Sequence, residues 1–281
     1  MAVTSYHPES LLAELAEHAR ALRLESVRMI HRRGAGHPGG ALSAAEIVAA
    51  LYFHKLRIDP ARPDWPERDR FILSKGHAAA VLYAALARRG FFPAADLEHW
   101  GEVDCHLQGH PDRNLTPGVD MTAGFLGHGI PVGVGLALAA RMQKQAHRIY
   151  VLLGDGECQG GVLWEGAMAA AKYRLASLTA ILDYNDVQLD GAVHDIMPLE
   201  PLVEKWRAFN WNVLEVNGHN LRQVLEALDT ACEIHGGPTV IVAHTTKGKG
   251  VSFMENRAAW HGAAPDDAQL RQAEEELGRK P

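Results

Sequence analysis

Apolar side chains recur along this chain at two spacings, and the two alternate from one segment to the next. Between Ser10 and His31, leucine, valine and isoleucine return every three or four residues with charged residues between them, which predicts an amphipathic helix. A capping box at Ser43-Ala44-Ala45-Glu46 predicts that a second helix starts there. By contrast, the unbroken apolar run in RIYVLLGDG is typical of a strand buried on both faces of a parallel sheet.

The alternation continues to residue 243. Further helices are expected at Ala78–Ala87, Val132–Gln143, Val162–Tyr173, Leu202–Phe209 and Leu221–Cys232. Further strands are expected at Phe71–Leu73, Leu178–Leu182, Asn212–Val216 and Thr239–Ala243. Strands that alternate with helices predict an α/β fold, a doubly wound and mainly parallel sheet with helices on both faces. Ligands of such sheets bind beyond the carboxyl ends of the strands.

The 281 residues, of which 47% are hydrophobic, are enough for one large domain, and we expect a single domain over residues 1–281. Its last part, residues 263–281, is expected to be a helical tail. Because this tail is acidic and rich in alanine and glutamate from Asp266 onward, we expect it to be weakly held. Residues 101–130 are rich in Gly, Pro, His and Asp, and they predict a long irregular segment, a kind that is usually functional or disordered.

Composition and net charge restrict the kinds of molecule that this chain is expected to bind. The net charge is −6 and the basic residues are scattered, which argues against nucleic acid or an anionic membrane. The cysteines Cys105, Cys158 and Cys232 are odd in number and far apart, as is typical of reduced thiols in the cytoplasm. No secretory signal is visible, and the apolar stretch 130–140 is too short to span a bilayer. We therefore expect a cytoplasmic protein that binds small molecules or protein.

The sharpest chemical signal is Gly154-Asp155-Gly156 at a predicted strand end, with Asn185 at the end of the next strand. Adjacent parallel strands would bring these two loops together. The Asp155 carboxylate, the Asn185 amide oxygen and the Val187 carbonyl oxygen then form a hard donor set suited to Mg²⁺ with phosphate oxygens. The glycines and the start of the following helix leave backbone N–H groups free for a diphosphate. A Gly-Asp-Gly sequence alone would more often be an ordinary turn.

Two other patterns point to different ligands only weakly. The segment with His99, Cys105, His106 and His110 matches no common zinc spacing. The glycines of 127–135 lack the preceding strand and the downstream acid of a dinucleotide-binding loop.

The segments GDGECQGG and LDYNDVQLDG resemble the thiamine-diphosphate fingerprint of transketolases. Four more segments resemble that family in its order: AGHPGGALSAAEIVAALYF, DRFILSKGHAAAVLYAAL, GHPDRNLTPGVDMTAGFLGHG and HTTKGKGVSFMEN with the later WHG. The resemblance covers about residues 20–262. It implies thiamine diphosphate and Mg²⁺ as cofactors, with Ca²⁺ or Mn²⁺ as substitutes, bound by a diphosphate-binding (PP-type) domain of the thiamin-diphosphate-binding fold.

The resemblance also implies roles for single residues. The catalytic set would be His37, His77, His110 and His261, because an imidazole can bind a phosphate oxygen or move a proton on a sugar. The cofactor-binding set would be His77, Gly124, Phe125, Leu126, Gly154, Asp155, Gly156, Glu157, Asp183, Asn185, Leu189 and His261. The metal set would be Asp155, Asn185 and Val187. Taken singly, each histidine is more often an ordinary loop residue, and Leu189 is equally compatible with plain core.

Thiamine diphosphate acts as an electron sink when the carbon–carbon bond of a ketose is broken. In transketolases the glutamate that activates it comes from a pyrimidine-binding domain, which follows the point where this sequence stops. The resemblance therefore implies the N-terminal subunit of a split transketolase, active only with a C-terminal subunit that carries this glutamate, in an α₂β₂ assembly. The reaction would transfer a two-carbon ketol unit from a ketose or ketose phosphate to an aldose.

Three residues depart from the family pattern. Gly160 stands where many relatives carry a glutamate that links paired sites, so proton coupling between sites is in doubt. Phe125 and His128 replace a smaller residue and a glutamine, so the pocket is expected to differ in shape. Two alternatives stay open: another thiamine-diphosphate enzyme, of the 2-oxoacid dehydrogenase E1 or deoxyxylulose-phosphate synthase kind, and a non-catalytic scaffold.

Overall fold

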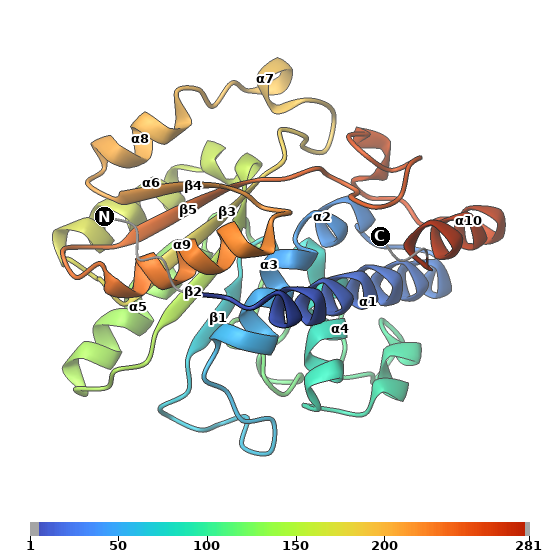
Figure 1. Ribbon diagram of the computed structural model, residues 1–281, viewed down its shortest axis with the longest axis horizontal. Coiled ribbons are helices and arrows are strands. Elements are labelled where there is room, and N and C mark those ends of the chain that lie inside the picture. The colour runs from blue at the N-terminus through green and yellow to red at the C-terminus, as the bar shows by residue number, and fades with distance from the viewer. Residues whose placement is uncertain (1–5, 279–281) are drawn as a thin grey trace.

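A computed structural model describes residues 6–278. Its sheet has five strands, all parallel, in the order β1-β2-β3-β5-β4 (Figure 1). The strands are β1 Arg70–Leu73, β2 Ile149–Gly154, β3 Leu178–Tyr184, β4 Asn212–Asn217 and β5 Thr239–His244. The run before Gly154 forms the buried strand that its apolar pattern predicts.

Helices cover both faces of the sheet. The α-helices are α1 Glu9–Arg33, α2 Pro38–Ser43, α3 Ala45–Ala50, α4 Ala79–Arg89, α5 Gly129–Met142, α6 Gly161–Lys172, α7 Val193–Ile196, α8 Leu202–Ala208, α9 Leu221–Glu233 and α10 Asp267–Gly278. A π-helical turn, Leu51–Lys55, follows α3. Short 3₁₀ segments lie at Gly76–Ala78, Ala94–His99, Asp155–Gln159 and Ala258–Trp260.

Successive strand residues belong to two separate cores. Tyr150 and Leu152 pack with α1, α3, α4 and α9 on one face, whereas Val151 and Leu153 pack with α5, α6 and α8 on the other. Alternate side chains of a strand point to opposite faces, so a strand covered on both sides must be apolar throughout. The predicted doubly wound α/β fold is confirmed.

The predicted capping box is wrong. Ser43 ends α2, and its hydroxyl donates to Asp183 Oδ2 at 2.6 Å, far along the chain. Helix α3 begins at Ala45 with Ala44 before it and no side-chain cap. Glu46 instead accepts from Arg23 Nη2 at 2.5 Å. The two side chains that would have formed the capping box, Ser43 and Glu46, are therefore bound by residues far away in the sequence.

The acidic tail is helical over α10, but the expected weak attachment is wrong. Ala273 and Leu277 are buried against the rest of the chain, at 0% and 5% exposed. Arg28 Nε of α1 also donates to Glu274 Oε1 at 2.7 Å. Because Ala273 and Leu277 are four residues apart, they lie on the same side of α10 and give this acidic helix an apolar face. Residues 279–281 of the expected tail lie outside the described residues.

Parallel pairing aligns the strand ends that matter for the site. Gly154 of β2 pairs with Asp183 of β3, and Tyr184 pairs with His244 of β5. The loops after β2, β3 and β5 therefore leave the sheet at one edge. Within the described residues, no helix is both long and apolar enough to cross a membrane.

Candidate functional site

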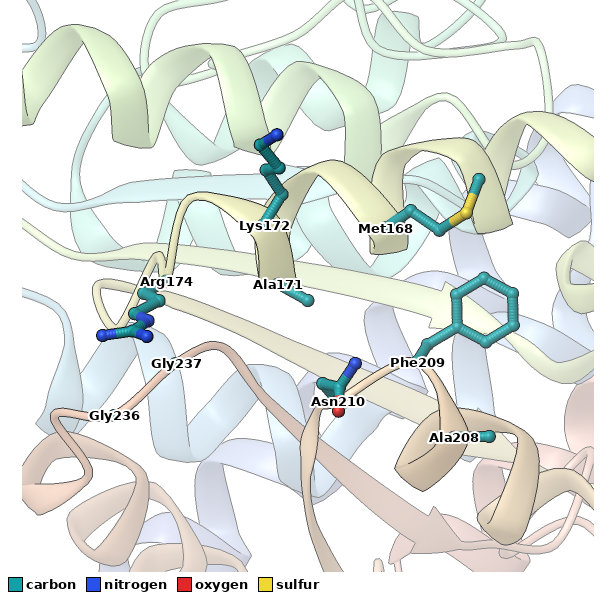
Figure 2. A pocket seen from close by; sticks show the side chains of 9 residues that line it. All are labelled: Met168, Ala171, Lys172, Arg174, Ala208, Phe209, Asn210, Gly236 and Gly237. Atoms are coloured by element: carbon teal, nitrogen blue, oxygen red, sulfur yellow. The ribbon is translucent and has the colours of Figure 1, made fainter.

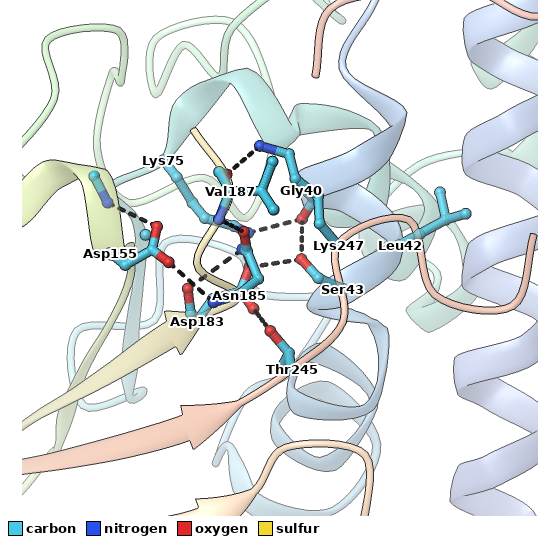
Figure 3. Close-up of polar contacts among 12 residues, drawn as sticks. Gly40, Leu42, Ser43, Lys75, Asp155, Asp183, Asn185, Val187, Thr245 and Lys247 are labelled. Atoms are coloured by element: carbon cyan, nitrogen blue, oxygen red, sulfur yellow. Dashed lines mark hydrogen bonds and ion pairs between the residues drawn. The ribbon is translucent and has the colours of Figure 1, made fainter. Parts of the chain in front are cut away.

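Asp155 joins the loops after β2 and β3 (Figure 3). Its Oδ2 accepts from the backbone amides of Asn185 at 3.0 Å and Asp186 at 2.6 Å. Its Oδ1 accepts from the amide of Gly156 at 2.7 Å. The two strand tips that the sequence places side by side are therefore tied together by one carboxylate.

The three predicted oxygen donors line one cavity of about 220 Å³. Asn185 turns its amide nitrogen to Asp183 Oδ2 at 3.2 Å, which leaves its Oδ1 on the side of the Val187 amide, 3.2 Å away. The Val187 carbonyl accepts from Lys247 Nζ at 2.5 Å. Asp155, Asn185 and Val187 thus bring a carboxylate, an amide and a carbonyl oxygen to the same space.

Asp155 is a buried carboxylate without an ion pair among the described residues. Only 3% of it is exposed. Burial, and next the charge of Asp183, raise its pKa from 3.8 to about 6. A buried anion without an ion-pair partner favours either a proton or a bound cation, even though the charge of Lys247 lowers the Asp155 pKa somewhat. Oxygen donors of this kind suit a hard divalent cation, so the residues fit the predicted Mg²⁺.

Asp183 forms the floor of the site. It is fully buried and accepts from Lys75 Nζ, Thr245 Oγ1 and Ser43 Oγ. Burial pushes its pKa upward, but the Lys75 charge and these hydrogen bonds outweigh burial and lower the pKa. Lys75 Nζ also donates to the Gly40 carbonyl at 2.7 Å. This ionised cluster fixes the relative positions of α2, β1, β3 and the loop after β5 (Figure 3).

Two lysines of the site were missed by sequence reasoning. Lys75 and Lys247 both line the cavity, and only 2% and 3% of them are exposed. Burial, and next the charge of Lys75, lower the pKa of Lys247 to about 8. The signal that could have found Lys75 is its placement directly after a predicted strand, since a lysine there is expected at the ligand edge. Lys247 follows its predicted strand only after three further residues, so it carries no such signal.

The four predicted histidines come together from four separate segments. Ring centroids of His37 lie 5.2 Å from His77, 5.5 Å from His261 and 6.4 Å from His110. His77 and His261 are 5.1 Å apart. His77 and His261 line the same cavity as Asp155.

All four imidazoles are held neutral at neutral pH. Burial is the largest cause in each case, and it lowers the pKa of His37 and His110 and puts that of His77 far below its usual range. Burial and then Lys247 lower the pKa of His261 to about 3. Because the Lys247 ammonium can only donate, His261 Nδ1, 2.8 Å away, is the acceptor and its proton is on Nε2.

The Glu157 carboxylate accepts hydrogen bonds from three groups of the protein itself. It accepts from Ser74 Oγ at 2.6 Å and from the backbone amides of Gly127 and Gly154 at 2.8 Å each. Burial raises the pKa of this carboxyl group. These contacts fasten the loop 124–127 to the tip of β2, so the geometry gives Glu157 a holding role. Its predicted contact with cofactor stays a prediction.

Residues 14–281 match the family model described as transketolase, thiamine diphosphate binding domain. The chain belongs to the transketolase family. The 6-deoxy-6-sulfo-D-fructose transketolase subunit of a Clostridium strain is 43% identical, covering 95% of this chain and 97% of that subunit. An apulose-4-phosphate transketolase subunit of Phocaeicola vulgatus is 40% identical, covering 92% of each.

Solved transketolases share this fold over part of their length. The transketolase of Leishmania mexicana is 31% identical with a TM-score of 0.89, over 95% of this chain and 42% of that one. The transketolase of Campylobacter jejuni is 32% identical with a TM-score of 0.88, over 98% of this chain and 44% of that one. The transketolase domain described here therefore spans less than half of these longer chains.

In this transketolase domain, large apolar side chains at the cavity rim are exposed. Leu126 and Leu189 line the cavity, yet 46% and 61% of their surface is exposed. The reading of Leu189 as plain core is therefore wrong. Phe125 is 71% exposed and packs on His128 at 4.3 Å between ring centroids, but it does not line the cavity. Gly124 does not line it either.

Figure 2 shows a second hollow of the transketolase domain, with a volume of about 680 Å³. It shares no lining residue with the cavity around Asp155. Its walls include Arg174, Asn210 and Gly237, which precede β3, β4 and β5. It opens at the amino ends of the strands and is lined by no histidine or carboxylate, so we assign it no role. Across residues 6–278, no three His, Cys, Asp or Glu side chains are grouped to hold a metal.

Proposed function

We propose that this chain is the cofactor-binding subunit of a transketolase that moves a two-carbon ketol unit from a ketose to an aldose. Thiamine diphosphate would be held through Mg²⁺ by Asp155, Asn185 and the Val187 carbonyl. The observation that carries the proposal is the buried, unpaired Asp155 carboxylate beside two further oxygen donors, in a chain of the transketolase family. Ca²⁺ or Mn²⁺ would satisfy the same donors.

When bound, thiamine diphosphate supplies the electron sink for cleaving the ketose carbon–carbon bond. The chain's own residues would bind, orient and exchange protons around it. Lys247 Nζ lies 2.8 Å from His261 Nδ1 and would place positive charge near the diphosphate. This contact also leaves the His261 Nε2–H free to donate to a phosphate or sugar oxygen. His37, His77 and His110, neutral like His261, can each accept or donate a proton at a sugar hydroxyl.

Gly154 and Gly156 would let the backbone approach the diphosphate. Neither has a side chain to fill the cavity they line, and a Cβ on Gly156 would lie 3.4 Å from Gln188 Oε1. Leu126 and Leu189, exposed at the rim, would support the organic part of the cofactor together with Phe125 and Gly124 of the same loop.

The site would be completed by a second chain. A cavity of about 220 Å³ is smaller than the ~300–1,000 Å³ of complete ligand pockets, and its rim carries the exposed Leu126 and Leu189. Two relatives matched over nearly their full length are named as transketolase subunits. We propose a C-terminal partner subunit that carries the pyrimidine-binding domain and its glutamate, in an α₂β₂ complex.

Sugars or sugar phosphates are the proposed substrates. One relative is named for 6-deoxy-6-sulfo-D-fructose and another for apulose-4-phosphate, so a sugar with an anionic substituent is a reasonable first choice. The proposed location is the cytoplasm, which the three unpaired cysteines support.

The test is co-expression with the protein encoded by the adjacent gene, followed by a two-carbon transfer assay with ketose donors and aldose acceptors. We expect transfer only when both subunits, thiamine diphosphate and Mg²⁺ are present. A complex that binds the cofactor but transfers nothing across a panel of phosphorylated, sulfonated and neutral ketoses would contradict the proposal. Asp155→Ala is expected to fold and to lose Mg²⁺-dependent cofactor retention.

A further inference from the structure

His219, in the turn between β4 and α9, is bound at both ring nitrogens. Nε2 lies 2.8 Å from the backbone amide nitrogen of Thr246, and Nδ1 lies 3.0 Å from Glu46 Oε2. A backbone N–H can only donate, so Nε2 is the acceptor and the ring proton is on Nδ1, where it is donated to Glu46. The two partners fix the tautomer and the orientation of the ring.

Glu46 is itself held from a third direction. Its Oε2 accepts from Arg23 Nη2 at 2.5 Å, and Arg23 Nε donates to the Leu42 carbonyl at 3.0 Å. Glu46 is 8% exposed and Arg23 is 7% exposed. Burial favours the neutral acid, but the charge of Arg23 and the bonds from His219 and Arg23 outweigh it and lower the Glu46 pKa. The carboxylate that orients His219 is therefore ionised and itself fixed.

Thr246 lies between two residues of the site. Thr245 Oγ1 donates to Asp183, and Lys247 Nζ contacts the Val187 carbonyl and His261 Nδ1. The Thr245 amide donates to the Tyr184 carbonyl at 3.0 Å, whereas the Thr246 amide, within the described residues, is bonded by His219. The segment Thr245–Lys247 thus depends on a side chain from another loop for one backbone anchor.

The turn between β4 and α9 and the segment after β5 contact each other directly. The Gly218 amide donates to the His244 carbonyl at 2.8 Å. A Cβ on Gly218 would lie 2.5 Å from Thr245 Cγ2, so glycine is what allows this close approach. His219 therefore reaches Thr246 from a loop already fastened beside it.

We propose that His219 is a positioning residue, which holds the Thr246 amide so that Lys247 stands between the Val187 carbonyl and His261. Arg23 and Glu46 act through His219, and the contact chain runs from α1 through α3 to the cofactor site. The effect on cofactor binding rests on the proposed function, whereas the anchoring of Thr246 does not.

The experiment compares His219→Ala, His219→Asn and His219→Gln in the complex with the partner subunit. Glutamine places an oxygen near the position of Nε2 and can accept from Thr246, whereas asparagine is too short and alanine offers no acceptor. His235→Gln, at an exposed histidine away from the site, is the matched control. The readouts are hydrogen exchange at the Thr246 amide, by mass spectrometry with residue-level fragmentation, and the thiamine diphosphate Kd in excess Mg²⁺.

Losing the acceptor of this half-buried amide is expected to speed exchange at Thr246 and to weaken cofactor binding by about tenfold or more in the alanine and asparagine variants. The glutamine variant should stay within about threefold of wild type on both readouts, and His235→Gln should match wild type. Unchanged exchange in His219→Ala, or a glutamine variant as defective as alanine, would overturn the proposal. If the wild-type complex binds no thiamine diphosphate, the proposed function fails, and exchange at Thr246 still decides the role of His219.

Discussion

Replacing Asp155 by asparagine should stabilise the metal-free chain while removing its metal site. The pKa of Asp155 is raised from 3.8 to about 6, chiefly by burial. The Asp155 carboxyl group therefore binds a proton more tightly in the folded chain than in the unfolded chain. Stability from this group is present below the unfolded value of 3.8 and is lost as pH rises through 6. Two pKa units correspond to about 3 kcal/mol, and this is the destabilisation at pH 7.5.

Asparagine removes that cost but loses one acceptor. The asparagine oxygen at the Oδ2 position would still accept hydrogen bonds from the backbone amides of Asn185 and Asp186. Its NH₂ group would take the place of Oδ1, which in wild type accepts from the Gly156 amide, so this amide would lose its acceptor. The unmet amide costs about 1–2 kcal/mol, so the net gain is about 1–2 kcal/mol. For a chain of 281 residues we expect a Tm rise of about 2–4 °C.

The assay is thermal unfolding of the purified chain in EDTA, at pH 7.5 and again near pH 4. The stabilising effect should shrink at the lower pH, where Asp155 is protonated in the folded wild type. Asp190→Asn, at an exposed aspartate of the neighbouring loop, should leave Tm unchanged at both values. A Tm for Asp155→Asn at or below wild type at pH 7.5 would refute the reasoning. In the complex with Mg²⁺ and thiamine diphosphate, wild type and Asp190→Asn should gain stability, whereas Asp155→Asn should not.

Three further outcomes are expected. Lys75→Met leaves the buried Asp183 carboxylate without its ion-pair partner and should lower stability by about 3–5 kcal/mol, seen as a Tm fall of about 10 °C; a fall under ~2 °C would contradict the importance of this pair. His77→Ala should weaken cofactor binding or slow turnover in the complex, and wild-type kinetics would remove it from the site. Leu189→Ala, at a residue 61% exposed in the free chain, should leave Tm within about 1 °C yet weaken thiamine diphosphate binding about tenfold; equal affinity would exclude it as cofactor support.

The sheet and its ligand edge could be predicted because their causes are local. A strand covered on both faces must be apolar along its whole length, and a polar residue that follows such a strand must lie at the sheet's edge. Asp155 and Asn185 satisfy both conditions, so their meeting follows from strand adjacency alone.

The features that were predicted wrongly or missed have a different origin, because they depend on contacts between residues far apart in the chain. Ser43 and Glu46 form a capping box by spacing, but Asp183 and Arg23 compete for their side chains in the folded chain. Nothing in the local pattern of Lys247 distinguishes it from a surface lysine. Its burial follows from the approach of three loops that no local pattern describes.

The most direct test of the account is a crystal structure of the two-subunit complex grown with thiamine diphosphate and Mn²⁺, with anomalous scattering used to locate the metal. We predict one Mn²⁺ bound by Asp155, Asn185 Oδ1 and the Val187 carbonyl, with diphosphate oxygens completing its coordination. A metal and diphosphate found elsewhere, with Asp155 still bound only by backbone amides, would contradict the central claim.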